Sequence, residues 1–271
     1  MVIDTHVHIG GENLWFNMSE ELVLEMIKKY KIDYCIVSNA DSTEFDLNQK
    51  LLPENVQISE EASLLKVIKF ARQHKDKIGI AIWVKPYLQQ PSEKFLKLIE
   101  ENIDLIHAIK LHPYHSNISP VDKRVIPYLE IASKYKLAVV SHTGGCEAAA
   151  PIHMLEAARL FPDIPFVMAH MGLGSDNEEA ISLLGMADNL YGDTAWVSMA
   201  STIKAIEKYG ISKMMFGSDA PIDGLDTYLC NKKGERSIYQ DYFNIIEEKI
   251  GRTAYECLMY KNAMKVYNIK L

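Results

Sequence analysis

Two hydrophobic periods alternate along the chain. Short, nearly continuous apolar runs rich in β-branched residues are separated by stretches in which apolar residues return every three or four positions. The short runs predict β-strands, and the longer stretches predict amphipathic helices. Runs such as Ile78–Val84 are apolar at successive positions, which indicates strands buried on both faces and hence a parallel sheet. The predicted strands lie within residues 1–10, 32–38, 78–84, 106–111, 137–141, 165–169, 190–194 and 213–216.

The predicted helices fall between these strands. Some have recognisable ends, since Pro127 stands in a first turn, Gly210 follows a last turn, and Ser175 with Glu178 forms a capping box. The predicted helices cover residues 22–30, 64–71, 92–102, 127–134, 151–160, a segment opened at 175, 201–209, 239–250 and 254–267. Strict alternation of eight strands with helices is typical of one α/β architecture, the (β/α)8 TIM barrel. We expect residues 1–271 to form a single domain of this kind.

An open, doubly wound parallel sheet is the alternative architecture. Such a sheet predicts a glycine-rich phosphate loop after the first strand. Gly10 and Gly11 follow that strand, but they do not continue into such a loop or into a P-loop lysine. The barrel is therefore favoured.

Composition narrows the class of protein. Apolar residues make up 48% and charged residues 24% of the chain, and no apolar run approaches the roughly 20 residues of a membrane span. The first residues run directly into a strand without a basic and apolar leader, so we expect a cytoplasmic protein without a membrane partner. The net charge of −7 disfavours a nucleic-acid surface. Four cysteines without paired spacing indicate reduced thiols.

Two segments lack a convincing period. Residues 39–59 form a long stretch without predicted structure, and loops of that length inside a compact domain are usually functional or disordered. We therefore regard this segment as a candidate lid. Together with residues 221–236, it is where we expect substrate specificity to reside.

Polar side chains concentrate where the predicted strands end. In a regular first strand, Asp4, His6 and His8 share one face, and Ile3, Thr5 and Val7 share the other. Two imidazoles on one face can share a metal ion, although two hydrogen-bonded histidines are an equally good account of the pair alone. Barrel enzymes carry their active sites at the carboxyl ends of the strands. Further strand ends carry Lys110, His112, His142, His170 and Asp219.

Taken together, these strand ends indicate a metal site. Independent turn residues need not all be nitrogen and carboxylate ligands. The set resembles the amidohydrolase superfamily, in its amidohydrolase-related (amidohydrolase 2) branch of metal-dependent TIM-barrel hydrolases. The resemblance covers nearly the whole chain, in family order. The matching stretches are Asp4–His8, Ile109–Pro113, Val140–Gly144, Met168–Gly172, Phe216–Pro221 and Tyr260–Ala263.

Two neighbouring groups fit less well. TatD-type nucleases carry a glutamate motif around the third and fourth strands, whereas residues 79–84 contain no acid. They also usually have threonine where this chain has Ser218. PHP phosphoesterases share the His-x-His pair but expect further ligands that do not occur here in order.

The resemblance implies a metal centre. It implies that His6, His8, His142 and Asp219 hold a divalent metal, with His170 as a further ligand or a neighbouring group. Imidazole and carboxylate ligands suit zinc, while manganese, iron and nickel stay open. Asp219 would take a proton from metal-activated water and return it to the leaving group, and His170 would stabilise an oxyanion or orient the water.

Lys110 decides the number of metal ions in this interpretation. In some members of the superfamily the lysine of the fourth strand is carboxylated and bridges two metals, with His142 and His170 on the second ion. In the mononuclear branch there is no such bridge. The alternative for Lys110 is an ammonium group that binds a substrate carboxylate.

The leading functional hypothesis is hydrolysis of a small-molecule amide, lactone or ester. A decarboxylase or hydratase of the same barrel family is the first alternative, and a metal-binding protein without catalysis is the second. We expect substrate contacts from His112, Trp15 and Tyr114; loop residues Tyr87, His115 and Trp196 are further candidates. The sequence leaves oligomeric state open, a homo-oligomer included.

Overall fold

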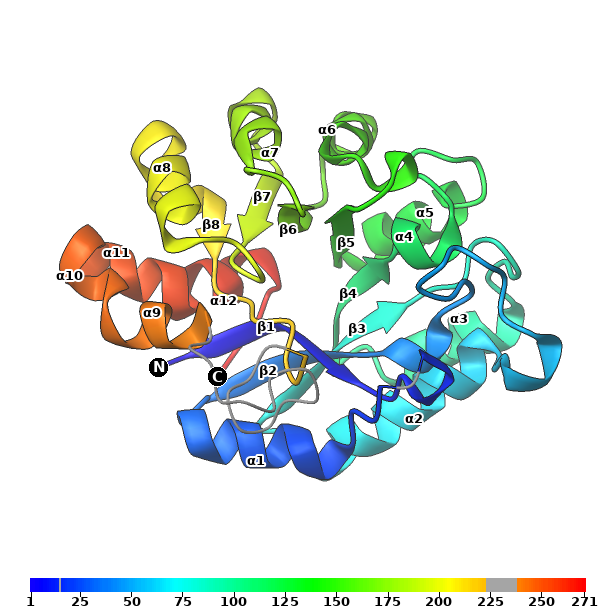
Figure 1. Ribbon diagram of the computed structural model, residues 1–271. Coiled ribbons are helices and arrows are strands. Elements are labelled where there is room, and N and C mark those ends of the chain that lie inside the picture. The colour runs from blue at the N-terminus through cyan, green and yellow to red at the C-terminus, as the bar shows by residue number, and fades with distance from the viewer. Residues whose placement is uncertain (15, 223–237) are drawn as a thin grey trace.

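The computed structural model describes residues 1–14, 16–222 and 238–271 (Figure 1). Trp15, Cys230 and almost all of the proposed specificity segment 221–236 lie outside the described residues. Within the described residues, no helix is long and apolar enough to cross a membrane. The cysteines described, Cys35, Cys146 and Cys257, are free thiols, as their spacing predicted.

Eight parallel strands form one sheet in sequence order, which confirms the predicted barrel architecture. Each strand pairs with the next through parallel hydrogen bonding. The segment after β8 returns to the first strand, because Thr5 N–H donates to the Phe216 carbonyl and His8 N–H donates to the Ala220 carbonyl. The strands are β1 (Ile3–Ile9), β2 (Tyr34–Asn39), β3 (Ile78–Trp83), β4 (Ile106–Leu111), β5 (Ala138–Gly144), β6 (Phe166–Leu173), β7 (Leu190–Asp193) and β8 (Met214–Met215).

Helices surround the strands on the outside of the sheet (Figure 1). Several begin at a serine whose hydroxyl accepts an N–H of the first turn, as Ser19 does before α1. The helices are α1 (Glu20–Tyr30), α2 (Glu60–Gln73), α3 (Glu93–Glu101), α4 (Pro113–Ser116), α5 (Ile126–Tyr135), α6 (Pro151–Leu160), α7 (Glu178–Leu183), α8 (Met199–Tyr209), α9 (Ile238–Asn244), α10 (Ile246–Ile250), α11 (Arg252–Glu256) and α12 (Asn262–Val266).

Three predicted helix features are wrong. The single predicted helix over 239–250 is divided at Ile245 into α9 and α10. Ser175 does not cap α7, because the helix begins later, after Asn177, and the Ser175 hydroxyl donates to the Gly172 carbonyl within the preceding turn. The single predicted helix over 254–267 is also interrupted. A π-helical stretch, Cys257–Lys261, separates α11 from α12, and within it the Leu258 carbonyl accepts the Phe216 N–H beside β8.

The buried core has two main parts. Large apolar residues such as Val37, Phe70 and Phe166 pack between the strands and the helices. A smaller cluster that includes Ile36, Ala108 and Ala169 comes mainly from alternate strand positions and from the C-terminal segment. Small side chains such as alanine suit the narrow interior of a barrel.

β1 departs from strict alternation. Its register against β2 shifts between Asp4 and Val7. Ile3 therefore packs in the smaller cluster with Ile36, whereas Val7 packs in the larger one, although a regular strand would place both on the same face. The predicted common face for Ile3 and Val7 is wrong for this reason.

The segment 39–59 is folded onto the barrel. It contains two 3-10 turns, Ala40–Ser42 and Glu54–Val56, and residues 40–45 are buried. Phe45 N–H donates to the His115 carbonyl, and His115 Nδ1 bonds the Phe45 carbonyl at 2.7 Å. The first half of this segment is thus a wall beside the strand ends, and its role as a lid stays a prediction.

Candidate metal centre

The polar residues predicted from the strand ends come together at one end of the barrel. His6 and His8 lie on β1, Lys110 on β4, His142 on β5 and His170 on β6. Asp219 follows β8, where its N–H donates to the His6 carbonyl. All of these side chains are buried.

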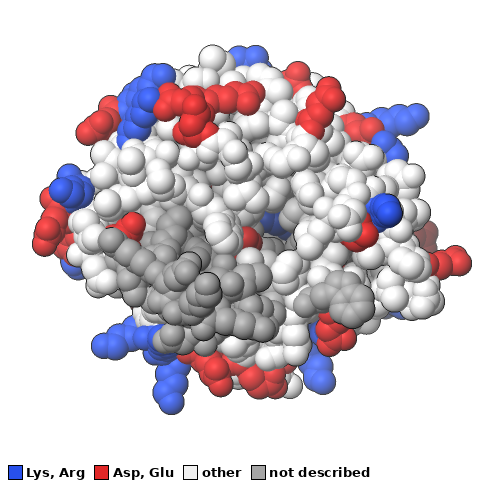
Figure 2. Space-filling view, in the orientation of Figure 1, with Lys and Arg blue, Asp and Glu red and all other residues white. Residues whose placement is uncertain are grey.

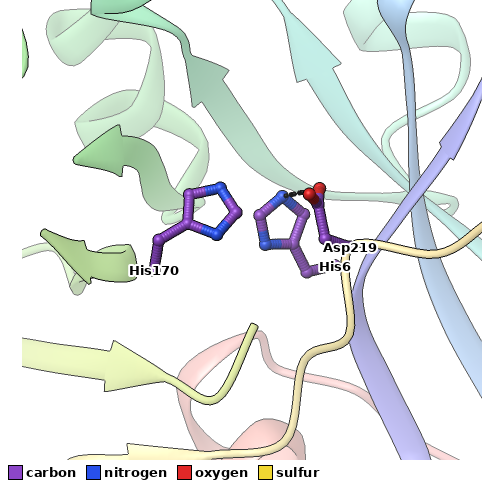
Figure 3. Close-up of side chains that lie close together, drawn as sticks. All are labelled: His6, His170 and Asp219. Carbon is purple, nitrogen blue, oxygen red and sulfur yellow. Dashed lines mark ion pairs between the residues drawn. The ribbon is translucent and has the colours of Figure 1, made fainter. Parts of the chain in front are cut away.

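Three of these residues present candidate metal-ligating atoms close together. One atom each of His6, His170 and Asp219 lies within 4.8 Å of the others (Figure 3). The ring of His8 lies 5.0 Å from that of His6, and the ring of His142 lies 4.8 Å from that of His170, centroid to centroid. The two further predicted ligands thus adjoin the cluster.

His6 has a carboxylate on each side of its ring. Its Nδ1 lies 2.8 Å from Asp193 Oδ2, and its Nε2 lies 3.2 Å from Asp219 Oδ1. The Lys110 amine also approaches Nε2, at 2.8 Å. His8 Nε2 lies 2.9 Å from the same Asp219 oxygen, so this oxygen faces both histidines of β1.

His142 and His170 each direct one nitrogen to a carbonyl. His142 Nε2 lies 3.2 Å from the Gly144 carbonyl oxygen, and His170 Nδ1 lies 3.2 Å from that of Ala195. A carbonyl only accepts, so these nitrogens carry the hydrogen and the opposite ones keep a lone pair. His142 Nδ1 is buried and lacks a hydrogen-bond partner among the described residues. Metal-binding histidines characteristically donate their other N–H in this way, so the residues fit a metal ion.

Burial favours the protonation states that bind metal. Burial lowers the pKa of His6 and His142 well below the usual value and that of His170 to about 4, so the rings are neutral at pH 7. Burial alone would raise the pKa of Asp219, but His6 and the hydrogen bond from His8 lower it well below its usual value. Neutral imidazoles beside an ionised carboxylate are the forms that ligate a cation.

Lys110 is fully enclosed by the site. Burial lowers its pKa to about 8, against the opposing effect of Asp219 and Asp193. Its amine is therefore much closer to its neutral form than that of an exposed lysine.

A cavity of about 330 Å³ adjoins the cluster, and His8, His142, His170 and Asp219 form part of its wall. The centre of the face in Figure 2 is hollowed, and charged side chains lie mainly around its margin. One side of the cavity is a stack of flat rings. Trp83 lies parallel to His112 at 4.6 Å between ring centroids, and His112 lies nearly parallel to His142 at 4.3 Å.

Only some of the predicted substrate-contact residues line the cavity. His112, Tyr114 and His115 line the cavity. Tyr87 is not among the described lining residues, and Trp15 lies outside the described residues. Trp196 is 42% exposed and donates its indole N–H to Asp219 Oδ2 at 2.8 Å.

A larger cavity of about 650 Å³ lies at the opposite ends of the strands, around Ile106 and the C-terminal segment. Its histidine, His107, has both ring nitrogens engaged, with the Tyr34 hydroxyl and the Tyr267 carbonyl, each at 2.9 Å. His107 therefore offers no free nitrogen to a ligand, and the candidate metal ligands lie at the smaller cavity.

Comparison with known families agrees with this geometry. The family model described as amidohydrolase matches residues 3–269. The chain belongs to the amidohydrolase family. The resemblance inferred from the strand-end motifs is thereby confirmed. A comparison with curated protein sequences finds no match.

Solved structures similar to this chain include enzymes with different reactions. 4-Oxalomesaconate hydratase from Rhodopseudomonas palustris is 15% identical with a TM-score of 0.69, over 99% of this chain and 96% of that chain. A dihydroxybenzoic acid decarboxylase from Polaromonas sp. JS666, with bound manganese and the inhibitor 2-nitroresorcinol, is 11% identical with a TM-score of 0.69, over 98% and 96%. 5-Carboxyvanillate decarboxylase from Sphingomonas paucimobilis is 13% identical with a TM-score of 0.67, over 99% of both chains. At these identities the likeness shows the fold.

The site contains residues that the sequence did not predict. Asp193 ends β7 and bonds His6, Ser38 on β2 lies 2.8 Å from His8 Nδ1, and Trp83 ends β3. Each is at a strand end, so the rule that found the histidines could also have found them. Asp193 lies in the predicted strand 190–194, whose apolar pattern is weak. Ser38 and Trp83 belong to apolar runs, which predict core positions.

Proposed function

We propose that this member of the amidohydrolase family is a metal-dependent hydrolase that acts on a small-molecule amide, lactone or ester. The observation that carries the proposal is the buried cluster of His6, His170 and Asp219, with ligand atoms within 4.8 Å, beside a cavity of about 330 Å³. His6, His8, His142 and Asp219 would hold the metal, with His170 as a further ligand or a catalytic neighbour. A divalent ion supplies Lewis-acid polarisation and the activation of water.

The chain's own groups would move the proton. Asp219 would accept it from the attacking water and return it to the leaving group, since the carboxylate is ionised and reaches the cavity. His170, which also lines the cavity, would stabilise the negative charge that develops on the substrate oxygen. Tyr114 and the ring of His112 would contact the rest of the substrate.

Ligand chemistry favours zinc at this site. Imidazole nitrogens with one carboxylate are typical of zinc, but iron, manganese and nickel also accept them. The decarboxylase from Polaromonas contains manganese. Metal identity should therefore be tested by reconstitution of the metal-free protein with each ion.

Metal content and one substitution test this proposal. We expect purified protein to carry a stoichiometric transition metal and His142→Asn to lose most of it, because the substitution removes a ligand next to the cluster. His153→Asn is the matched control, since His153 pairs with Glu156 on helix α6. Protein without stoichiometric metal, or unchanged metal content in His142→Asn, would refute a metal centre that uses His142.

A second candidate function is decarboxylation or hydration of a flat, unsaturated acid. The stacked rings of Trp83, His112 and His142 along one side of the cavity favour it, because their free faces and edges offer aromatic contacts to a conjugated substrate. A panel of aromatic carboxylic acids separates the two reactions. Release of CO2 without a hydrolytic product would favour the lyase, and turnover of esters, lactones or amides would favour the hydrolase. A metal-loaded protein that turns over neither panel would favour the non-catalytic alternative.

Lys110 retains the two roles inferred from the sequence. As an ammonium it would bind a substrate carboxylate, and as a carboxylated lysine it would bridge two ions. Growth or reconstitution with ¹³C-labelled bicarbonate, followed by carbon NMR of the intact protein, distinguishes them. A carbamate resonance that Lys110→Met abolishes would assign the bridge.

A further inference from the structure

We infer that Asp193 is a positioning residue that fixes the tautomer of His6 and the backbone of His170, and so sets the affinity of the metal centre. The effect on metal affinity rests on the proposed function. The hydrogen bonds of Asp193 are observed in the structure itself. Nothing in the sequence pattern had assigned a role to Asp193. Its place at the end of β7 puts it between β1 and β6 of the same site.

Asp193 uses both carboxylate oxygens within the site. Oδ2 accepts from His6 Nδ1 at 2.8 Å, and the side chains of these two residues are 1% and 2% exposed. Oδ1 accepts the His170 N–H at 2.9 Å and the Ala195 N–H at 3.1 Å. One buried carboxylate therefore joins two candidate ligands that lie far apart in sequence.

The contacts of His6 specify one tautomer. An ionised carboxylate only accepts, so Asp193 requires a hydrogen on His6 Nδ1. The Lys110 ammonium only donates, so its 2.8 Å contact requires a lone pair on Nε2. That lone pair faces Asp219 Oδ1 at 3.2 Å, and two acceptors so close together form a place for a cation. Asp193 thus keeps Nε2 in the form that can ligate.

The same carboxylate holds an unusual backbone. His170 and Met171 have φ of 69° and 48°, in the left-handed region that non-glycine residues rarely adopt. Asp193 Oδ1 takes the His170 N–H, and the Asn177 side-chain amide donates to the His170 and Met171 carbonyls at 3.3 and 2.9 Å. These bonds satisfy the polar groups of the strained turn and aim the His170 ring at the cluster.

The partner of His8, the other histidine of β1, differs from that of His6. His8 Nδ1 faces the Ser38 hydroxyl at 2.8 Å. A hydroxyl donates or accepts, so Ser38 does not select a tautomer. Ser38→Ala is therefore a matched control, because it removes a buried polar partner from the neighbouring ligand without dictating its protonation.

Asp193→Asn is the informative substitution. The Asn oxygen can keep the two backbone N–H bonds, which leaves its amide nitrogen opposite His6 Nδ1. That amide donates, so His6 must move its hydrogen to Nε2 and lose its free lone pair. The variant has the same shape and keeps the hydrogen bonds of residue 193, so it should fold, although the Lys110 ammonium then faces the Nε2 hydrogen and loses its acceptor. Partners of this kind typically change metal affinity about 10- to 100-fold.

Two measurements on metal-free protein and one on metal binding test the inference. Histidine ¹⁵N NMR should show His6 protonated at Nδ1 in the wild type and in Ser38→Ala, and at Nε2 in Asp193→Asn. Thermal melting checks that each variant folds. Zinc affinity, measured by competition with a chromophoric chelator, should fall about 10- to 100-fold in Asp193→Asn and by a smaller factor in Ser38→Ala, whose His6 tautomer is unchanged.

The outcomes separate this inference from the proposed function. A wild-type protein that binds no metal refutes the proposed function, while the NMR measurement still decides whether Asp193 sets the tautomer. His6 protonated at Nε2 in the metal-free wild type would overturn the inference even if Asp193→Asn fails to fold. So would a folded Asp193→Asn that keeps the Nδ1 hydrogen or the wild-type zinc affinity.

Discussion

The indole N–H of Trp196 donates to Asp219 Oδ2 at 2.8 Å, while the other carboxylate oxygen of Asp219 faces the two histidines of β1. Both residues have left-handed backbone, with φ of 58° for Trp196 and 67° for Asp219. The partly exposed Trp196 side chain therefore reaches Asp219 from a loop whose neighbouring residues, Ala195 and Val197, are buried. Its hydrogen bond leaves one oxygen of Asp219 directed at the metal centre.

Trp196→Phe should weaken metal binding without unfolding the protein. Phenylalanine keeps a flat side chain but removes the donor, so Asp219 loses the partner that fixes its rotation. We expect zinc affinity to fall about tenfold, at the low end for a partner of this kind. Tyr87→Phe is the control, because Tyr87 is similarly exposed, at 41%, and does not line the site. Equal zinc affinities of the two variants would argue against a role for the indole N–H.

Trp83→Leu should discriminate between planar and flexible ligands. Stacked aromatic pairs contribute about 0.5–1.5 kcal/mol beyond their buried area. Loss of the ring next to His112 should therefore weaken binding of planar aromatic acids about 2- to 13-fold and leave aliphatic acids of similar size nearly unchanged. Isothermal titration of both ligand classes measures this difference. Leu47→Ala, elsewhere on the cavity wall, should affect both classes alike.

Asn262→Asp should destabilise the barrel closure. The Asn262 amide donates to the Ile211 and Met214 carbonyls at 2.7 and 2.8 Å, which ties α12 to the start of β8. A carboxylate cannot donate, so both carbonyls lose this donor, although the Ile211 carbonyl keeps the Met214 N–H. Loss of the bond to the buried Met214 carbonyl should cost roughly 1–3 kcal/mol. Urea unfolding should show this loss. Asn268→Asp, at an exposed position of the same segment, should change the unfolding free energy by less than about 0.5 kcal/mol.

Glu44 should make stability fall as pH rises. Burial raises the pKa of Glu44 from 4.5 to about 8, against the hydrogen bonds from Leu88 and Tyr87 N–H. Between these values the folded state binds more protons than the unfolded state, so the unfolding free energy decreases with pH, by at most about 1.4 kcal/mol per pH unit. Glu44→Gln should flatten this slope between pH 5 and 8.

Denaturant unfolding at a series of pH values measures the slope for each protein. Glu54→Gln serves as the control, because Glu54 is an exposed carboxylate in the same loop as Glu44. Its slope should match that of the wild type. Identical slopes for wild type and Glu44→Gln would show that Glu44 is not held protonated in the folded protein.

Local sequence determined the strands and helices of this protein. Buried parallel strands must be apolar at successive positions, and helices on the outside must be apolar on one side, so each element carries its own signal. The order of those elements then leaves few architectures, and the barrel places every strand end at one face. This is why His6, His142, His170 and Asp219 could be grouped before any distance was known.

Other features depend on contacts between distant segments. The register shift in β1 has no local signal, because it arises from pairing with β2 at one edge and with the segment after β8 at the other. Trp83 lies within an apolar run, which predicts a core position, although its side chain lines part of the cavity. A side chain's neighbours across the barrel are not encoded in its own segment.

The sequence by itself thus determined the alternation of strands and helices, the barrel and the polar residues at its carboxyl edge. Tertiary structure alone decided which nitrogen of each histidine is free, because that depends on acceptors brought from other strands: Asp193 for His6 and the Ala195 carbonyl for His170. Which atom donates in a hydrogen bond depends on the donor and acceptor groups that the fold brings together. Periodicity along a chain can place a ligand at the site, but only its neighbours across the barrel set its protonation.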